Sequence, residues 1–285
     1  MRVLVTGATG FIGRHVVPSL LDQGLEVIAT SRNKNKAKNY DWYNEVEYIE
    51  CDYHNDALDY YNALGKPDVI IHLAWNGLPN YKDPFHVERN LPANCLFLKN
   101  FIEGGIKKMV VTGTCYEYGI RCGCLHESDN TQPVTQYGLA KDTLRKYLEF
   151  LVSDTPTSFN WVRLFYLYGD GQNQNSLLPQ LERAISEGEK VFNMSGGEQL
   201  RDYLSVEDAA RNLCTISLQS EVDGIVNCCS GNPISIRRLV ENKINLLNSD
   251  IELNLGYYPY PDYEPMAFWG GIDRLMKIKN LSLKN

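Results

Sequence analysis

Tyr137 and Lys141 stand four residues apart in the segment Tyr-Gly-Leu-Ala-Lys. On a helix this spacing places the phenol and the ammonium group on one face. A tyrosine with an ordinary pKa of about 10 is a poor acid–base catalyst at neutral pH, but a neighbouring cation favours the phenolate and lowers that pKa. The pair therefore has the composition of a proton-transfer site, although the same spacing also occurs by chance on helix surfaces.

Three glycines, Gly7, Gly10 and Gly13, follow the first apolar run and precede the first helical pattern. Glycines at a strand-to-helix turn allow a tight bend, close approach of the backbone to a pyrophosphate, and close packing of the helix. The helix N-terminus adds oriented N–H groups and partial positive charge. We predict a dinucleotide site here; the alternative is a glycine-rich turn that binds nothing.

The end of the second predicted strand carries Ser31 and Arg32, followed by Lys34 and Lys36. Sites that prefer NAD usually place an Asp or Glu there, beside the adenosine ribose. A guanidinium can instead hold a 2′-phosphate through charge-assisted hydrogen bonds. NADP(H) is therefore the predicted cofactor and NAD(H) stays possible, since the basic residues also suit a solvated loop.

These residues need a scaffold, and the first half of the chain alternates short apolar runs with helical patterns. Strands are predicted over 2–6, 26–31, 47–51, 69–73, 108–112 and 160–164, and helices over 12–23, 56–64, 84–104 and 137–154. This alternation predicts an α/β fold with a Rossmann-type, doubly wound parallel sheet. We expect an NADP-binding domain over 1–168 and, over 169–285, a smaller mixed C-terminal lobe that binds substrate. Helices over 177–187 and 205–219 and a short last helix near Ile272 belong to the second part, in which strand 224–228 returns to the main sheet.

The composition narrows the classes of partner. The chain has 285 residues, a formal net charge of -7 and a pI near 5.3, which argue against general binding to nucleic acid or to an anionic membrane. An anionic ligand must then be held by a few placed cations. The eight cysteines lack paired Cys-x-x-Cys spacing, so we predict reduced thiols and no metal site. With no apparent signal peptide or membrane-spanning run, the predicted location is the cytoplasm.

Four features occur in one characteristic order: the Gly-x-x-Gly-x-x-Gly turn, Asn90, Thr114 and the Tyr137/Lys141 pair. Over nearly the whole chain this arrangement resembles the extended short-chain dehydrogenase/reductase family, within the NAD-dependent epimerase/dehydratase proteins. Segments 113–119 and 193–202 look most like the nucleotide-diphospho-4-keto-6-deoxyhexose reductases.

The resemblance implies a role for each catalytic residue. The Thr114 hydroxyl would donate a hydrogen bond to the substrate oxygen, and Tyr137 would exchange the proton. Lys141 would favour the phenolate and reach the cofactor ribose, and Asn90 would support Lys141 through water.

The resemblance also implies the contacts of the cofactor. Asp52 would lie beside the adenine, and the turn at Leu73 and Ala74 would run under the cofactor. The implied cofactor residues are Gly7, Thr9, Gly10, Phe11, Ile12, Gly13, Ser31, Arg32, Asp52, Leu73, Ala74 and Lys141.

On the substrate side, segment 163–169 resembles the family's Arg-x-x-Asn-x-Tyr-Gly, with Tyr166 where Asn is usual. Arg201 lies in an Arg-Asp-Tyr segment whose arginine commonly holds the substrate diphosphate; the alternative is a structural salt bridge. The implied substrate-binding residues are Thr114, Tyr116, Tyr137, Tyr166, Leu177 and Arg201.

The expected reaction is NADPH-dependent reduction of the 4-keto group of a dTDP-, GDP- or CDP-linked 6-deoxyhexose, as in deoxysugar and surface polysaccharide (O-antigen) biosynthesis. A dehydratase would carry Asp-Glu where Cys115 and Tyr116 stand. A nucleotide-sugar epimerase with tightly bound NAD and a non-catalytic NADP sensor are the alternatives. The family also implies a homodimer.

Overall fold

Seven parallel strands form the central sheet of the computed structural model, which describes residues 1–54 and 59–283. Their order across the sheet is β11-β7-β5-β4-β1-β2-β3. The strands are β1 (Arg2–Thr6), β2 (Glu26–Ser31), β3 (Glu47–Glu50), β4 (Val69–His72), β5 (Lys108–Thr114), β7 (Ser158–Leu164) and β11 (Gly224–Cys228). The order reverses between β1 and β4, which makes the crevice at their carboxyl ends the expected ligand site of a doubly wound sheet. The predicted fold class is confirmed.

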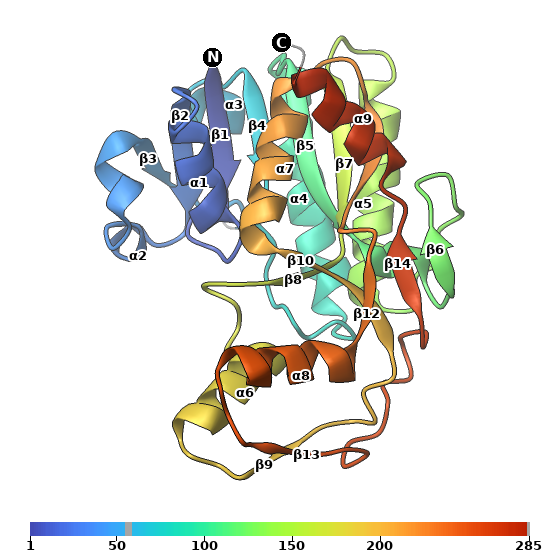
Figure 1. The fold of residues 1–285 in the computed structure, drawn as a ribbon. Coiled ribbons are helices and arrows are strands. Elements are labelled where there is room, and N and C mark those ends of the chain that lie inside the picture. Colours follow the sequence, from blue (N-terminus) through green and yellow to red (C-terminus); the bar gives the residue numbers. More distant parts are fainter. Residues whose placement is uncertain (55–58, 284–285) are drawn as a thin grey trace.

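Helices cover both faces of this sheet (Figure 1). The helices of one hydrophobic cluster are α1 (Gly13–Leu21), α7 (Val206–Leu218) and α9 (Asp273–Ser282). Those of the other are α3 (Tyr60–Ala63), α4 (Leu91–Glu103) and α5 (Gln136–Val152). Two apolar layers therefore hold the strands in place.

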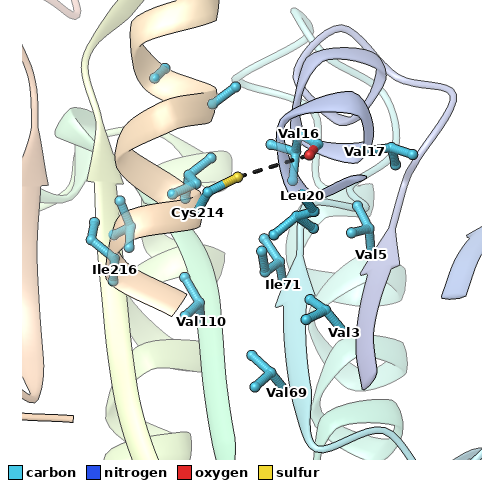
Figure 2. Close-up of a cluster of buried hydrophobic side chains, with 14 of the residues drawn as sticks. Val3, Val5, Val16, Val17, Leu20, Val69, Ile71, Val110, Cys214 and Ile216 are labelled. Atoms are coloured by element: carbon cyan, nitrogen blue, oxygen red, sulfur yellow. Dashed lines mark hydrogen bonds between the residues drawn. The ribbon is translucent and has the colours of Figure 1, made fainter. Parts of the chain in front are cut away.

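Strand β1 shows how the sequence produces these two layers. Val3 and Val5 belong to the cluster around α1 and α7, whereas Leu4, between them, belongs to the opposite one. Successive strand residues point to opposite faces, so a continuous apolar run is what a strand buried on both sides requires. Figure 2 shows Val3 and Val5 in one cluster with Val16 and Leu20 of α1, and the Cys214 thiol of α7 directed at the Val16 carbonyl oxygen, 3.8 Å away.

A smaller lobe extends from the carboxyl ends of the strands (Figure 1). It contains helices α6 (Leu177–Ser186) and α8 (Ile236–Leu246), which share a hydrophobic cluster with β9 (Val191–Asn193) and β13 (Glu252–Asn254). A three-stranded sheet, β12-β10-β8, lies between this cluster and the main sheet. Its strands are β8 (Tyr166–Tyr168), β10 (Leu200–Ser205) and β12 (Pro233–Ser235), and a second pair joins β6 (Gly123–Leu125) to β14 (Phe268–Gly270). Strand β11 pairs with β7, so the chain returns to the main sheet after building part of the lobe.

The elements differ from the sequence predictions in a few places. Strand β5 continues two residues further than expected, because Gly113 and Thr114 pair with β7. The single helix expected over 84–104 is a π-helical turn, η2 (His86–Asn90), followed by α4. Pro92 explains the break, since a proline lacks an N–H and crowds the carbonyl four residues earlier. The predicted helix over 56–64 begins in residues 56–58, which lie outside the described residues. Helix α8 was not predicted.

Within residues 1–54 and 59–283, no helix combines the length and the apolar character needed to cross a membrane. The same residues hold no group of three or more His, Cys, Asp or Glu side chains arranged for a metal ion.

Candidate active site

Thr114 and Tyr137 meet at the carboxyl end of the central sheet. Thr114 is the last residue of β5, and Tyr137 lies in the first turn of α5. The Thr135 hydroxyl caps this helix by accepting the Gly138 N–H at 3.1 Å, and the Tyr137 N–H donates to the Tyr81 carbonyl at 3.0 Å. These contacts fix the Tyr137 backbone and place its phenol beside the Thr114 side chain.

The predicted lowering of the Tyr137 pKa is wrong in this structure. Burial is the largest influence and raises the pKa of Tyr137 well above its ordinary value. The neighbours Tyr81, Glu117 and Cys115 raise that pKa further, and the polar side chain of Thr114 lowers it. Tyr137 therefore holds its proton at neutral pH, which suits a proton donor.

Lys141 lies one helical turn after Tyr137 and is buried, with 2% of its surface exposed. Its ammonium donates to the Thr112 carbonyl at 2.8 Å and lies 4.0 Å from the centre of the Trp75 ring. Burial lowers the pKa of Lys141 to about 7, and the Glu117 carboxylate opposes that shift. Lys141 is thus the one member of the predicted pair whose pKa moves toward neutrality.

Asn90 ends the π-helical turn η2, immediately before α4. Its side-chain amide donates to the Asn76 carbonyl at 3.0 Å and lies 3.3 Å from Nδ1 of His86. The Trp75 indole N–H lies 3.0 Å from the same nitrogen. Asn90 therefore reaches Lys141 through His86 and the Trp75 ring. His86 was missed in the sequence; its place four residues before Asn90 is the signal that could have found it.

A cavity of about 390 Å³ opens at the carboxyl ends of the strands next to the glycine turn. Its walls come from β1 and β2, the loops that follow β1 to β4, and one residue each of α2 (Lys34–Ala37) and α4. The lining residues are Thr6, Gly7, Thr9, Gly10, Thr30, Ser31, Arg32, Asn33, Lys36, Cys51, Tyr53, His54, Leu73, Ala74, Trp75, Asn76 and Phe97.

The glycine turn fits a dinucleotide. Gly7 has φ +66, and a Cβ there would lie 3.0 Å from the Ala74 nitrogen. A Cβ on Gly13 would lie only 2.3 Å from the Gly7 carbonyl oxygen. The Thr30 hydroxyl in the cavity wall is buried and has no hydrogen-bond partner among the described residues. A ligand can therefore approach the backbone of the turn closely, and Thr30 of β2 offers it a hydroxyl.

Some predicted cofactor residues lie away from the cavity lining. Ile12 precedes α1 and packs against the core, so the lining at the turn comes from Gly7, Thr9 and Gly10 rather than Phe11, Ile12 and Gly13. The Asp52 carboxylate accepts the His54 N–H at 3.2 Å, and Cys51 and Tyr53 on either side of it line the cavity.

Glu117 organises the floor of the site and was missed in the sequence. Its fully buried carboxylate accepts the Thr114 N–H at 2.8 Å, the Trp161 indole N–H at 2.9 Å and the Arg163 Nε–H at 2.8 Å. Burial raises the pKa of Glu117, and Arg163 opposes this shift. The network ties Thr114 to strand β7.

The predicted substrate residues Tyr116, Tyr166 and Arg201 converge on Glu264. The two phenols donate to one carboxylate oxygen, at 2.5 and 2.7 Å, and the Arg201 guanidinium lies 2.9 Å from the other. In this structure Arg201 therefore forms the salt bridge that was its alternative interpretation. Leu177, also predicted on the substrate side, is partly buried against the lobe's hydrophobic cluster.

Comparison with known proteins gives the relationship of this chain. The model of the "NAD dependent epimerase/dehydratase family" matches residues 3–229. The dTDP-6-deoxy-L-talose 4-dehydrogenase (NAD(+)) of Aggregatibacter actinomycetemcomitans is 32% identical over 276 residues, covering 95% of this chain and 99% of that protein. The dTDP-4-dehydro-6-deoxyglucose reductase of Escherichia coli is 25% identical, covering 84% of this chain and 79% of its own.

A solved structure agrees over nearly the whole length. The UDP-N-acetylglucosamine 4-epimerase from Methanobrevibacter ruminantium M1, in complex with UDP-N-acetylmuramic acid, superposes with a TM-score of 0.86 and 27% identity. The match covers 97% of this chain and 91% of that one. The family model over residues 3–229 and the 32% identical relative show that the chain belongs to the NAD-dependent epimerase/dehydratase family.

Proposed function

We propose that this protein is an NADPH-dependent 4-ketoreductase of a nucleotide-diphosphate 6-deoxyhexose linked to dTDP, GDP or CDP. The observation that carries the proposal is the placement of Tyr137 beside Thr114 at the end of β5, with Lys141 one turn further along the same helix. The relatives named as a 4-dehydrogenase and a reductase support it, because dehydrogenation and reduction are two directions of one reaction.

Thr114 and Tyr137 each have a separate role in the proposed reaction. A nicotinamide cofactor, when bound, supplies the hydride that reduces the sugar carbonyl carbon. The Thr114 hydroxyl donates a hydrogen bond to the carbonyl oxygen, and Tyr137 transfers its phenolic proton to that oxygen as the C=O bond becomes C–OH. The raised pKa of Tyr137 supports this direction, because the phenol is protonated before the reaction.

The preference for NADP is supported by charge in the cavity. Ser31, Arg32 and Lys36 line the same wall, and the Ser31 hydroxyl is held by the Tyr48 hydroxyl at 2.8 Å. Two cations beside a hydroxyl suit a 2′-phosphate. NAD(H) is the alternative, since the relative from Aggregatibacter actinomycetemcomitans is named with NAD(+).

An epimerase with tightly bound NAD is the second candidate, favoured by the likeness to a solved 4-epimerase. Thr114, Tyr137 and Lys141 would serve both enzymes, so the reactions must be separated by assay. The presence of all three counts against a non-catalytic NADP sensor.

The test is an incubation of the purified protein with NADPH or NADH and dTDP-, GDP- or CDP-linked 4-keto-6-deoxyhexoses. Stoichiometric oxidation of NADPH together with a new sugar hydroxyl supports the reductase, and faster turnover with NADPH than with NADH supports the cofactor preference. Isomerisation of a sugar nucleotide without net oxidation indicates the epimerase. Binding without turnover indicates the sensor.

We also propose that the protein forms a homodimer through α4 and α5. Helices α4 and α5 pack against each other, Leu96 on α4 is 61% exposed and Phe150 on α5 is 81% exposed, and exposed large apolar groups favour association. Phe150→Glu should shift the sedimentation coefficient toward that of a monomer. Leu246→Glu on α8, which is 73% exposed in the other lobe, is the control and should leave it unchanged.

A further inference from the structure

The Glu264 carboxylate is surrounded by hydrogen-bond donors, and the same donors could bind another anion. Tyr116, Tyr166 and Arg201, here called the anion cradle, supply two phenol O–H groups and a guanidinium at 2.5, 2.7 and 2.9 Å. The side chains of Arg201 and Glu264 are only 2% and 11% exposed. The cradle is therefore a desolvated site built for one negatively charged group.

Glu264 belongs to a segment held at both ends. The Tyr257 N–H donates to the Met194 carbonyl at 3.0 Å, and the Leu200 N–H donates to the Met266 carbonyl at 2.8 Å. Residues 258–265, here called the strap, read Tyr-Pro-Tyr-Pro-Asp-Tyr-Glu-Pro. Each proline fixes its φ and cannot donate a backbone hydrogen bond, so the strap is stiff and makes few backbone bonds.

The contacts on the outer side of the strap are exposed. Lys82 pairs with Asp262 at 2.9 Å, with side chains 62% and 82% exposed, and lies 5.1 Å from the centre of the Tyr263 ring. Exposed ion pairs contribute little to stability. The Glu264 carboxylate in the cradle is thus the buried polar attachment of the strap.

We infer that Glu264 is an internal competitor for the anion cradle, occupying the place that a phosphate of a nucleoside diphosphate takes when substrate binds. This inference rests on the proposed function, because that substrate carries the diphosphate. A carboxylate and a phosphate accept hydrogen bonds from the same donors, and two anions cannot share one buried site. Binding of the diphosphate therefore requires the strap to leave the cradle.

A measurable consequence follows for affinity. The apparent dissociation constant of a ligand is raised in proportion as the binding-competent fraction of the protein falls. If Glu264 fills the cradle in about nine molecules of ten, removing its charge tightens diphosphate binding about tenfold. A nucleoside without phosphates does not need the cradle and should bind with unchanged affinity.

The experiment is isothermal titration of dTDP, UDP, GDP and CDP, and of the matching nucleosides, into the wild-type protein and two variants. Glu264→Gln should bind at least one diphosphate about tenfold more tightly than wild type does. Glu252→Gln, which removes one charge from an exposed position on β13, is the matched control and should behave as wild type.

Unchanged or weaker diphosphate binding by Glu264→Gln overturns the inference, and the proposed function stands if the wild-type protein still reduces a sugar nucleotide. Failure of every diphosphate to bind any of the three proteins overturns both. Hydrogen exchange on the wild-type protein provides a test that does not depend on a variant. The amides of Tyr257 and Tyr258, which donate to the Met194 carbonyl, and of Leu200, which donates to the Met266 carbonyl, hold the ends of the strap. They should exchange faster with saturating diphosphate, whereas slower exchange would mean that the strap closes over the ligand and would overturn competition.

Discussion

Tyr137 keeps its proton in surroundings where burial, Tyr81 and Glu117 all oppose the phenolate. In the proposed reaction this phenol is the proton donor, and the Thr114 hydroxyl lies beside it. Tyr137→Phe removes the proton and leaves the ring packing, so turnover in the reductase assay should fall roughly 10²- to 10⁴-fold while NADPH binding persists. Tyr147→Phe, on the same helix, is the control and should retain wild-type turnover. Survival of turnover in Tyr137→Phe would disprove the catalytic assignment.

Lys141 makes the stability of the protein depend on pH, because its pKa is lowered in the folded state. Its folded pKa, lowered to about 7 by burial, lies below the ordinary value of 10.5. The unfolded chain therefore binds a proton that the folded protein does not, and the contribution of Lys141 to the free energy of unfolding falls as the pH drops from 10.5 to about 7 and is constant below that.

Cofactor binding should reverse this shift. The cofactor phosphates bring negative charge to the site, which favours protonated Lys141, so binding at pH 8 should take up most of one proton. Titration calorimetry of NADPH in buffers with different ionisation enthalpies measures that uptake. Lys141→Arg stays charged throughout and should show none; equal uptake in the variant would assign the proton to another group.

At the scale of elements, the turn between β1 and α1 depends on glycines, because a side chain would not fit there. The Cβ of Gly13→Ala would lie 2.3 Å from the Gly7 carbonyl oxygen, so the helix must move away from the loop that faces the cavity. We expect NADPH affinity to fall at least about tenfold, and the free energy of unfolding to fall by about 1–3 kcal/mol, as for other overpacked sites. Fluorescence titration and urea unfolding measure the two effects.

The control for this variant is Ser19→Ala, farther along α1 and outside the turn. Its unfolding free energy should stay within about 0.5 kcal/mol of wild type and its NADPH affinity should not change. Normal NADPH binding by Gly13→Ala would show that α1 does not need its close approach to the loop.

For the whole molecule, Asp202 links the lobe to the main sheet. It lies on β10 and is fully buried. Its carboxylate accepts the N–H and hydroxyl of Ser230, both at 2.7 Å, the Gly231 N–H at 2.9 Å and the Gly270 N–H at 3.2 Å. Ser230 and Gly231 follow β11 of the main sheet and Gly270 ends β14, so one side chain joins three distant parts of the chain.

Asp202→Ala leaves these donors without their acceptor, and the free energy of unfolding should fall by roughly 3 kcal/mol or more in urea unfolding. Asp250→Ala, at a carboxylate that is 87% exposed, is the control and should change it by less than about 0.5 kcal/mol. A loss below about 1 kcal/mol in Asp202→Ala would mean that other contacts hold the two parts together. The division into 1–168 and 169–285 stays a prediction.

Local patterns in the sequence were enough to predict most strands of the central sheet and several residues of the candidate site. The bounds of β1, β2 and β11 matched their predicted ranges, since apolar runs and turn residues mark a buried strand directly. The glycine turn and the Tyr137/Lys141 spacing were also readable, because each is complete within a few residues. The lobe was harder: α8 was missed although Ile236, Val240 and Ile244 follow one another at helical spacing, because no turn signal as clear as the glycine turn marks where it begins.

Only the tertiary structure decided what surrounds these groups. The Arg201 and Glu264 side chains that meet in the anion cradle are 63 residues apart in the chain, and Glu117 meets Arg163 across 46. No local sequence pattern predicts such pairs. The direction of the Tyr137 pKa shift could not be predicted from the sequence either. The sequence shows that Lys141 is near, but it does not show that Tyr137 is buried, and burial has the largest effect on the pKa. Burial belongs to the packed molecule, because it depends on every segment that excludes water from a site.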